Sequence, residues 1–184
     1  MSVEIVYETH SISVDNERGF ATGWLDGELS ERGRELALEL GTRRRDDEIA
    51  VVFSSDLRRA VETAEIAFGG SGIPIRLDAR LRECNYGELN GAPVARIESE
   101  RARRIDEPYP GGESYRDCVV RMRELLGDVA AEYDGRRVLL IGHAATRWAL
   151  QHLLVGTPLE ELVDAPFEWQ EGWEYTLGPP GGAP

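Results

Sequence analysis

Two of the three histidines stand at the ends of predicted strands, where their imidazoles could meet at one substrate. His10 follows the apolar run at residues 3–7, and His143 follows the run at residues 138–141. The crevice beyond the carboxyl ends of parallel strands is the usual ligand site in a sheet of this kind. A neutral imidazole nitrogen can attack phosphorus and carry the phosphoryl group covalently. A second histidine can then donate a hydrogen bond to the transferring oxygens.

An arginine and a glutamate in two other segments have chemistry that such a transfer needs. Arg58 and Arg59 lie at the start of the helix predicted at residues 57–68, directly after a strand. A helix N-terminus attracts anions, and the planar guanidinium of either residue can hold two phosphate oxygens. Glu83 lies in a loop at residues 81–89. Burial beside a leaving group would raise the pKa of its carboxyl and allow it to act as a general acid.

Apolar periodicity predicts the elements that position these residues. Strands are predicted at residues 3–7, 50–54, 73–77 and 138–141. Helices are predicted at residues 31–44, 57–68, 94–105, 115–133 and 146–154. The alternation of strands and helices favours an α/β fold, a three-layer α/β/α sandwich with a mainly parallel central sheet. We expect one domain at residues 1–177 and a flexible tail at residues 178–184, which is mostly Gly and Pro.

A set of short motifs occurs in order along the chain. The most specific is Ser54-Ser55-Asp56-Leu57-Arg58-Arg59-Ala60, with Thr63-Ala64 behind it. The supporting motifs are Leu81-Arg82-Glu83, Tyr86-Gly87, Pro110-Gly111-Gly112-Glu113-Ser114, and Gly142-His143 with Arg147. Together they resemble the histidine phosphatase superfamily, also called phosphoglycerate mutase-like. The resemblance runs from about residue 3 to residue 177 and implies the phosphoglycerate mutase-like sandwich fold.

The resemblance also implies a role for each candidate residue. His10 would accept the phosphoryl group, Arg59 and His143 would bind it, and Glu83 would be the proton donor. The substrate-binding positions implied are Ser13, Asn16, Thr22, Tyr86 and the backbone amide of Ala144. The expected activity is that of a histidine acid phosphatase-type phosphomonoesterase, which hydrolyses a small phosphorylated metabolite through a phosphohistidine intermediate, with no metal and no cofactor. Because the family's mutases generally carry longer insertions around the pocket, this compact chain favours hydrolysis over phosphoryl transfer.

One motif departs from the family pattern. The hallmark Arg-His-Gly is Thr9-His10-Ser11 in this chain, so an arginine expected on the phosphate is absent. A hydrogen bond to a charged group contributes about 1.5–3 kcal/mol, so its loss would weaken transition-state binding by about one to two orders of magnitude. The hydroxyls of Thr9 and Ser11 are candidates to replace part of the lost donation, and Arg82 or Arg147 is a candidate to compensate for the charge.

Composition excludes several classes of partner. The formal net charge of −13 repels a polyanion, so we expect no nucleic-acid binding. The chain has no basic and apolar leader and no run approaching the roughly 20 apolar residues of a membrane span, so we expect a cytoplasmic protein without membrane contact. Cys84 and Cys118 are far apart and form no C-x-x-C pair, which favours buried small side chains over a disulfide framework or a zinc site.

Two other functions remain open at this stage. The missing arginine is compatible with a catalytically impaired pseudophosphatase that binds a phosphorylated ligand or a protein partner. The aromatic residues Phe167, Trp169, Trp173 and Tyr175 are compatible with an oligomerisation module, although a strand and its packing explain them as well. A homodimer is also left open.

Overall fold

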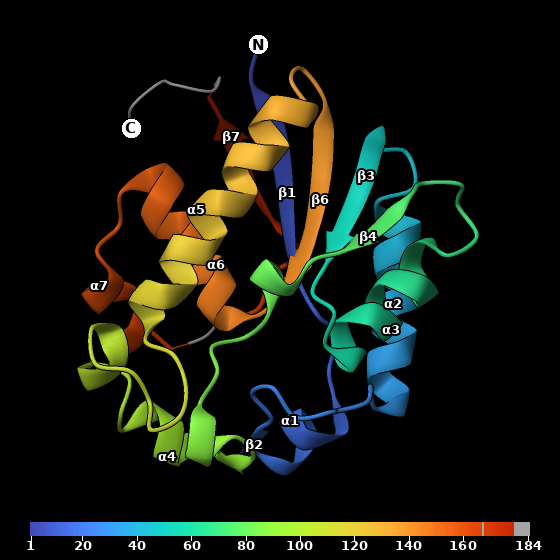
Figure 1. The fold of residues 1–184 in the computed structure, drawn as a ribbon. Coiled ribbons are helices and arrows are strands. Elements are labelled where there is room, and N and C mark those ends of the chain that lie inside the picture. The colour runs from blue at the N-terminus through green and yellow to red at the C-terminus, as the bar shows by residue number, and fades with distance from the viewer. Residues whose placement is uncertain (167, 179–184) are drawn as a thin grey trace.

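The central sheet places the carboxyl ends of its parallel strands at one edge of the molecule. A computed structural model describes residues 1–166 and 168–178, and within them the sheet has the strand order β4-β3-β6-β1-β7 (Figure 1). Strand β7 is antiparallel to β1, and the other neighbours pair in parallel. The strands are β1 (Val3–Thr9), β3 (Ile49–Ser54), β4 (Ile75–Leu77), β6 (Arg137–Gly142) and β7 (Trp173–Leu177).

Helices cover both faces of this sheet, as Figure 1 shows. One layer contains α5 (Tyr115–Glu132), α6 (Ala144–Val155) and α7 (Leu159–Asp164), and the other contains α2 (Glu31–Arg43) and α3 (Arg58–Phe68). Side chains alternate across each strand, so Ile5 and Tyr7 of β1 pack in one apolar core while Val6 packs in the other. The prediction of a three-layer α/β sandwich with a mainly parallel sheet is confirmed.

Short elements lie beyond the carboxyl ends of the strands, where Figure 1 shows α1, β2 and α4 side by side. Two of them are α1 (Val14–Arg18) and α4 (Val94–Glu98), and the small sheet is formed by β2 (Phe20–Ala21) with β5 (Ala92–Pro93). The hydroxyl of Ser13 caps α1, and Gly19 ends it with a φ of 76°. Single turns of 3-10 helix occur at Ala79–Leu81, Gly87–Leu89 and Arg103–Ile105.

Two predicted elements differ from the structure. The helix predicted at residues 94–105 breaks after α4, because Ser99 ends that helix and its hydroxyl donates to the carbonyl of Arg96. Only a single 3-10 turn follows, at Arg103–Ile105. The strand predicted at residues 73–77 is shorter, because only Ile75–Leu77 pairs with β3 as a strand.

The aromatic segment near the C-terminus has a structural explanation. Trp173 and Tyr175 belong to β7 and pack against the core, whereas Trp169 is exposed. Phe167 and residues 179–184 of the expected tail lie outside the described residues. In the part of the chain that the structure describes, no helix is long and apolar enough to cross a lipid bilayer.

The two cysteines are buried, as predicted, but their thiols lie close together. The sulfur atoms of Cys84 and Cys118 and a carboxylate oxygen of Glu113 lie within 4.8 Å of one another. The guanidinium of Arg121 donates to Cys118 Sγ at 3.1 Å and also pairs with Glu113. The guanidinium of Arg121 therefore supplies the positive charge in this cluster. The residues of the cluster are distant in the sequence.

Candidate active site

His10 follows β1 and has one unprotonated ring nitrogen, which is the form that can act as a nucleophile. Its Nδ1 lies 2.6 Å from the carbonyl oxygen of Ser11, so Nδ1 carries the proton and donates it. Its Nε2 therefore holds the lone pair, and Arg59 Nε donates to that atom at 3.3 Å. Burial, followed by the positive charge of Arg59, lowers the pKa of His10 to about 3. The imidazole is therefore neutral at ordinary pH, which is the form that can attack phosphorus.

Arg59 lies in the first turn of α3 and joins the two histidines. Its Nη2 donates to the carbonyl of Gly23 at 2.9 Å and to His143 Nδ1 at 3.2 Å. The side chain is buried, and its Nη1 has no hydrogen-bond partner among the described residues. A buried guanidinium nitrogen without a partner is costly, so the site is incomplete without an acceptor at this position.

His143 is held at the start of α6 by its backbone and by a serine. Its Nδ1 accepts from Arg59, so its Nε2 donates to Ser55 Oγ at 2.9 Å. The Tyr7 hydroxyl donates to the His143 carbonyl at 2.8 Å and contacts Thr146 Oγ1 at 2.6 Å. Complete burial, together with the charge of Arg59, lowers the pKa of His143 and keeps the imidazole neutral in the absence of an anion.

Glu83 lies in the loop after the 3-10 turn at Ala79–Leu81, and its buried carboxyl contacts the start of α6. Its Oε1 accepts hydrogen bonds from the backbone N–H groups of Cys84 at 2.8 Å and Ala145 at 3.2 Å. Burial raises its pKa, and these hydrogen bonds together with Arg59 oppose that rise. The balance favours a carboxyl that stays protonated to higher pH than an exposed glutamate, as a general acid requires.

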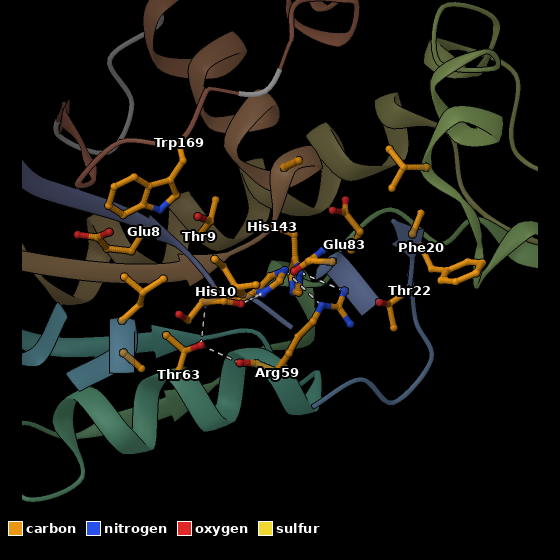
Figure 2. A pocket seen from close by; sticks show the side chains of 18 of the residues that line it. Glu8, Thr9, His10, Phe20, Thr22, Arg59, Thr63, Glu83, His143 and Trp169 are labelled. Carbon is orange, nitrogen blue, oxygen red and sulfur yellow. Dashed lines mark hydrogen bonds between the residues drawn. The ribbon is translucent and has the colours of Figure 1, made fainter. Parts of the chain in front are cut away.

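The structure brings these four side chains to one cavity. Figure 2 shows these side chains pointing toward one another. The ring centroids of His10 and His143 lie 4.9 Å apart. The cavity has a volume of about 660 Å³, and His10, Arg59, Glu83 and His143 all line it. It contains an unprotonated imidazole nitrogen, a buried carboxyl and a guanidinium with an N–H that has no partner among the described residues, a set of groups that suits phosphoryl transfer.

Most of the predicted substrate-binding positions also reach this cavity. Its lining includes Thr9, Ser11, Asn16, Thr22, Tyr86 and Ala144. Ser13 does not line it, because its buried hydroxyl caps α1 by accepting from the backbone N–H of Asn16. The Ser13 side chain therefore has a structural contact and does not face the cavity in this structure.

Three of the four expected replacements for the missing arginine have other partners, whereas Thr9 lines the cavity. Ser11 Oγ donates to the carbonyl of Gly33 at 2.6 Å, so its hydroxyl is already used. Arg82 pairs with Asp56 through two contacts of 2.6 Å, and Arg147 stacks over Trp173. Neither arginine lines the cavity. That prediction was wrong because these ion-pair and stacking partners come from distant parts of the chain.

Supporting residues and cavity walls were missed by the sequence analysis. Thr63 Oγ1 accepts from the backbone N–H of Ser11 at 2.9 Å and so orients the loop that carries His10. Ser55, which contacts His143, lies within the most specific motif. Its place in that motif is the sequence feature that could have identified it as a site residue. Phe20, Ile97 and Trp169 line the cavity without any sequence signal.

Restoring the arginine at position 9 should increase activity, since Thr9 lines the cavity beside His10 (Figure 2). We expect Thr9→Arg to raise kcat/KM for phosphomonoesters by about 10- to 100-fold, because a charge-assisted contact is added in the transition state. Phosphate release measures the effect. Thr9→Gln, which adds length without charge, is the matched control and should give no such gain; an equal gain in both variants would contradict the electrostatic explanation.

The match to a family model agrees with this geometry. The model for the histidine phosphatase superfamily (branch 1) matches residues 8–170, and the chain belongs to this superfamily. A probable phosphoglycerate mutase GpmB from Erwinia tasmaniensis is 31% identical over 164 residues, which cover 85% of this chain and 76% of that protein.

Solved structures of relatives show the same fold. YhfR from Bacillus stearothermophilus has a TM-score of 0.83 and 29% identity, over 98% of this chain and 93% of that one. A mycobacterial glucosyl-3-phosphoglycerate phosphatase has a TM-score of 0.75 and 30% identity, over 89% of this chain and 84% of that one. Similar proteins therefore include both a named phosphatase and a probable mutase.

Proposed function

We propose that this protein is a metal-independent phosphomonoesterase that acts on a small phosphorylated metabolite through a phosphohistidine on His10. The buried Nη1 of Arg59, which has no hydrogen-bond partner among the described residues, carries the proposal, because the same guanidinium contacts His10 through Nε and His143 through Nη2 in a cavity that also contains Glu83. A phosphoryl oxygen is the acceptor that such a nitrogen requires. Membership of the superfamily and the similarity to a named phosphatase support the same reaction class.

In the first step, His10 Nε2 attacks phosphorus in line as the bond to the leaving oxygen breaks. The charge on the nonbridging oxygens is stabilised by Arg59 and His143. Glu83 gives its proton to the leaving alcohol. In the second step the Glu83 carboxylate takes a proton from water, which attacks the phosphohistidine, releases inorganic phosphate and restores neutral His10.

The proposal is tested by release of inorganic phosphate from a panel of phosphomonoesters in the presence of EDTA. We expect turnover that EDTA does not reduce, because the charge stabilisation comes from Arg59 and His143. Activity that requires an added divalent cation would contradict the metal-independent scheme. Binding of phosphate without any turnover, even in Thr9→Arg, would favour the pseudophosphatase, which the absence of the arginine at position 9 supports as the second candidate.

The assignment of Glu83 as the proton donor has its own test. Glu83→Gln should lower kcat/KM for alkyl phosphates by about 10²- to 10³-fold, because an alkoxide is a poor leaving group without a proton. The loss for p-nitrophenyl phosphate should be under about 10-fold, since that leaving group departs as a stable anion. Glu88→Gln, at an exposed neighbouring glutamate, is the control.

The pH profile gives a second readout of this assignment. Because the pKa of Glu83 is raised, the carboxyl stays protonated at higher pH than usual, and kcat/KM for an alkyl phosphate should fall as pH rises through that pKa. The low-pH limb should follow protonation of His10, whose pKa lies at about 3. Glu83→Gln should lose the high-pH fall that belongs to this carboxyl; an unchanged profile would contradict the assignment.

A further inference from the structure

The cavity extends from the catalytic side chains in two directions. One branch follows α2 and is lined by Leu36, Ala37, Leu40 and Trp169, with an ion pair between Arg43 and Glu8. The other, which we call the Phe20 branch, is lined by Phe20, Ala21, Tyr86, Val94, Ile97 and Arg101. Figure 2 shows Glu8 and Trp169 on one side of His10, and Phe20 with Thr22 on the other.

In-line transfer selects one of these branches for the leaving group. The leaving oxygen must lie opposite the attacking Nε2 of His10 and close to the carboxyl that protonates it. Glu83 lies on the same side of His10 as Phe20 in Figure 2. The alcohol part of the substrate therefore extends into the Phe20 branch, and the groups that line this branch select it.

The walls of the Phe20 branch are mainly apolar. Phe20 pairs with Pro93 in the small sheet, and the N–H of Val94 donates to the carbonyl of Gly19, which keeps Phe20 beside the start of α4. Ile97 on α4 is buried against the core. Phe20 as a residue is 40% exposed, so part of its surface is available to contact a ligand. Exposed apolar surface inside a catalytic cavity is typical of a binding site for an apolar group.

The branch offers little to a second negative charge. Among the described residues that line it, Arg101 is the single cation; its Nη1 lies 3.5 Å from Glu98, its guanidinium stacks over Trp148, and its buried Nε has no hydrogen-bond partner. Because this single guanidinium is shared with a carboxylate and an aromatic ring, the branch neutralises a second anion less well than the position of Arg59, whose guanidinium contacts two histidines. The formal net charge of −13 adds a repulsive field. A leaving group with its own carboxylate or phosphate is therefore disfavoured.

We propose that the preferred substrates are phosphomonoesters whose leaving alcohol carries an aromatic or other apolar group, which packs against Phe20 and Val94. This inference rests on the proposed phosphatase function and defines its substrate class. Phe20 is the specificity-determining residue that is easiest to alter, because its exposed ring contributes contact surface without supporting the core.

Three alkyl phosphates with similar leaving groups test the inference: 2-phenylethyl phosphate, propyl phosphate and 3-phosphoglycerate. The leaving groups of the first two are primary alcohols of similar acidity, so a difference in kcat/KM between them reports binding of the phenyl group. We expect kcat/KM for 2-phenylethyl phosphate to exceed that for propyl phosphate by about 10-fold or more, with 3-phosphoglycerate below both. Phe20→Ala should reduce the first ratio to under about 3-fold.

Leu25→Ala is the matched control, because Leu25 is an exposed apolar residue of the same region that does not line the cavity. It should keep the native ratio between the phenylethyl and propyl esters. A preference for 3-phosphoglycerate, or an unchanged ratio in Phe20→Ala, would overturn the inference while leaving the phosphatase function intact.

A separate measurement distinguishes failure of the proposed phosphatase function from failure of the inferred substrate class. If no ester is hydrolysed, calorimetric titration with 2-phenylethylphosphonate and propylphosphonate measures the same selectivity without turnover. Tighter binding of the phenylethyl compound by about 10-fold, reduced in Phe20→Ala, would still support the substrate class. Equal binding of the two phosphonates, or no binding of either, would overturn it.

Discussion

Replacement of His10 by alanine should lower phosphate release from phosphomonoesters by about 10⁴-fold or more. The covalent route is lost in this variant, because the scheme places the phosphoryl group on His10 Nε2, the unprotonated ring nitrogen that accepts from Arg59 Nε at 3.3 Å. The other cavity imidazole, His143, contacts Arg59 and Ser55 through its two nitrogens. The scheme assigns His143 to binding of the phosphoryl group, so its imidazole should not restore the activity.

The third histidine provides the control for this measurement. His152 lies on α6, and its Nδ1 contacts the carbonyl of Thr157 at 2.8 Å, outside the cavity. His152→Ala should keep kcat/KM within about 3-fold of the native value. Substantial turnover by a correctly folded His10→Ala protein would rule out the phosphohistidine scheme.

The second large effect is expected at Arg59. Arg59→Ala removes the group that contacts both histidines and has a free N–H for the substrate, so kcat/KM should fall by about 10³-fold. Arg59→Lys should recover only part of this loss, because an ammonium group cannot form the same planar set of contacts. The loss should appear in kcat as well as in KM, because charge on the phosphoryl oxygens is stabilised most in the transition state.

Arg58 is a matched control at the adjacent position. Its guanidinium is exposed and pairs with Glu28 and Glu62, away from the cavity. Arg58→Ala should therefore change kcat/KM by less than about 3-fold. Similar losses in the two alanine variants would show that general electrostatics, and not the position of Arg59, determines the rate.

The convergence of the site could be predicted from sequence because it depends on strand ends. His10 and His143 follow β1 and β6, which are neighbours in the sheet, and Arg59 lies in the first turn of the helix after β3, the next strand. Parallel pairing brings these positions to one edge of the sheet independently of the conformations of the connecting loops. The types and order of these elements follow from apolar periodicity, which is strong in buried strands and amphipathic helices.

Features that depend on long-range contacts could not be predicted in this way. Arg82 and Arg147 had suitable charge, but their partners Asp56 and Trp173 are set by tertiary packing. The proximity of Cys84 to Cys118 has the same origin. The cavity walls are formed by short elements such as β2, whose position depends on pairing with β5 across about seventy residues of chain.

Direct detection of a phosphorylated His10 tests the central claim. The native enzyme would be mixed rapidly with a phosphomonoester, quenched under alkaline conditions that preserve phosphohistidine, and digested for mass spectrometry. We predict one phosphoryl group on the peptide that contains His10, bound at Nε2, formed and lost at rates fast enough for turnover. Turnover with no phosphorylated His10 peptide at any quench time, or with the phosphoryl group on another residue, would contradict the account.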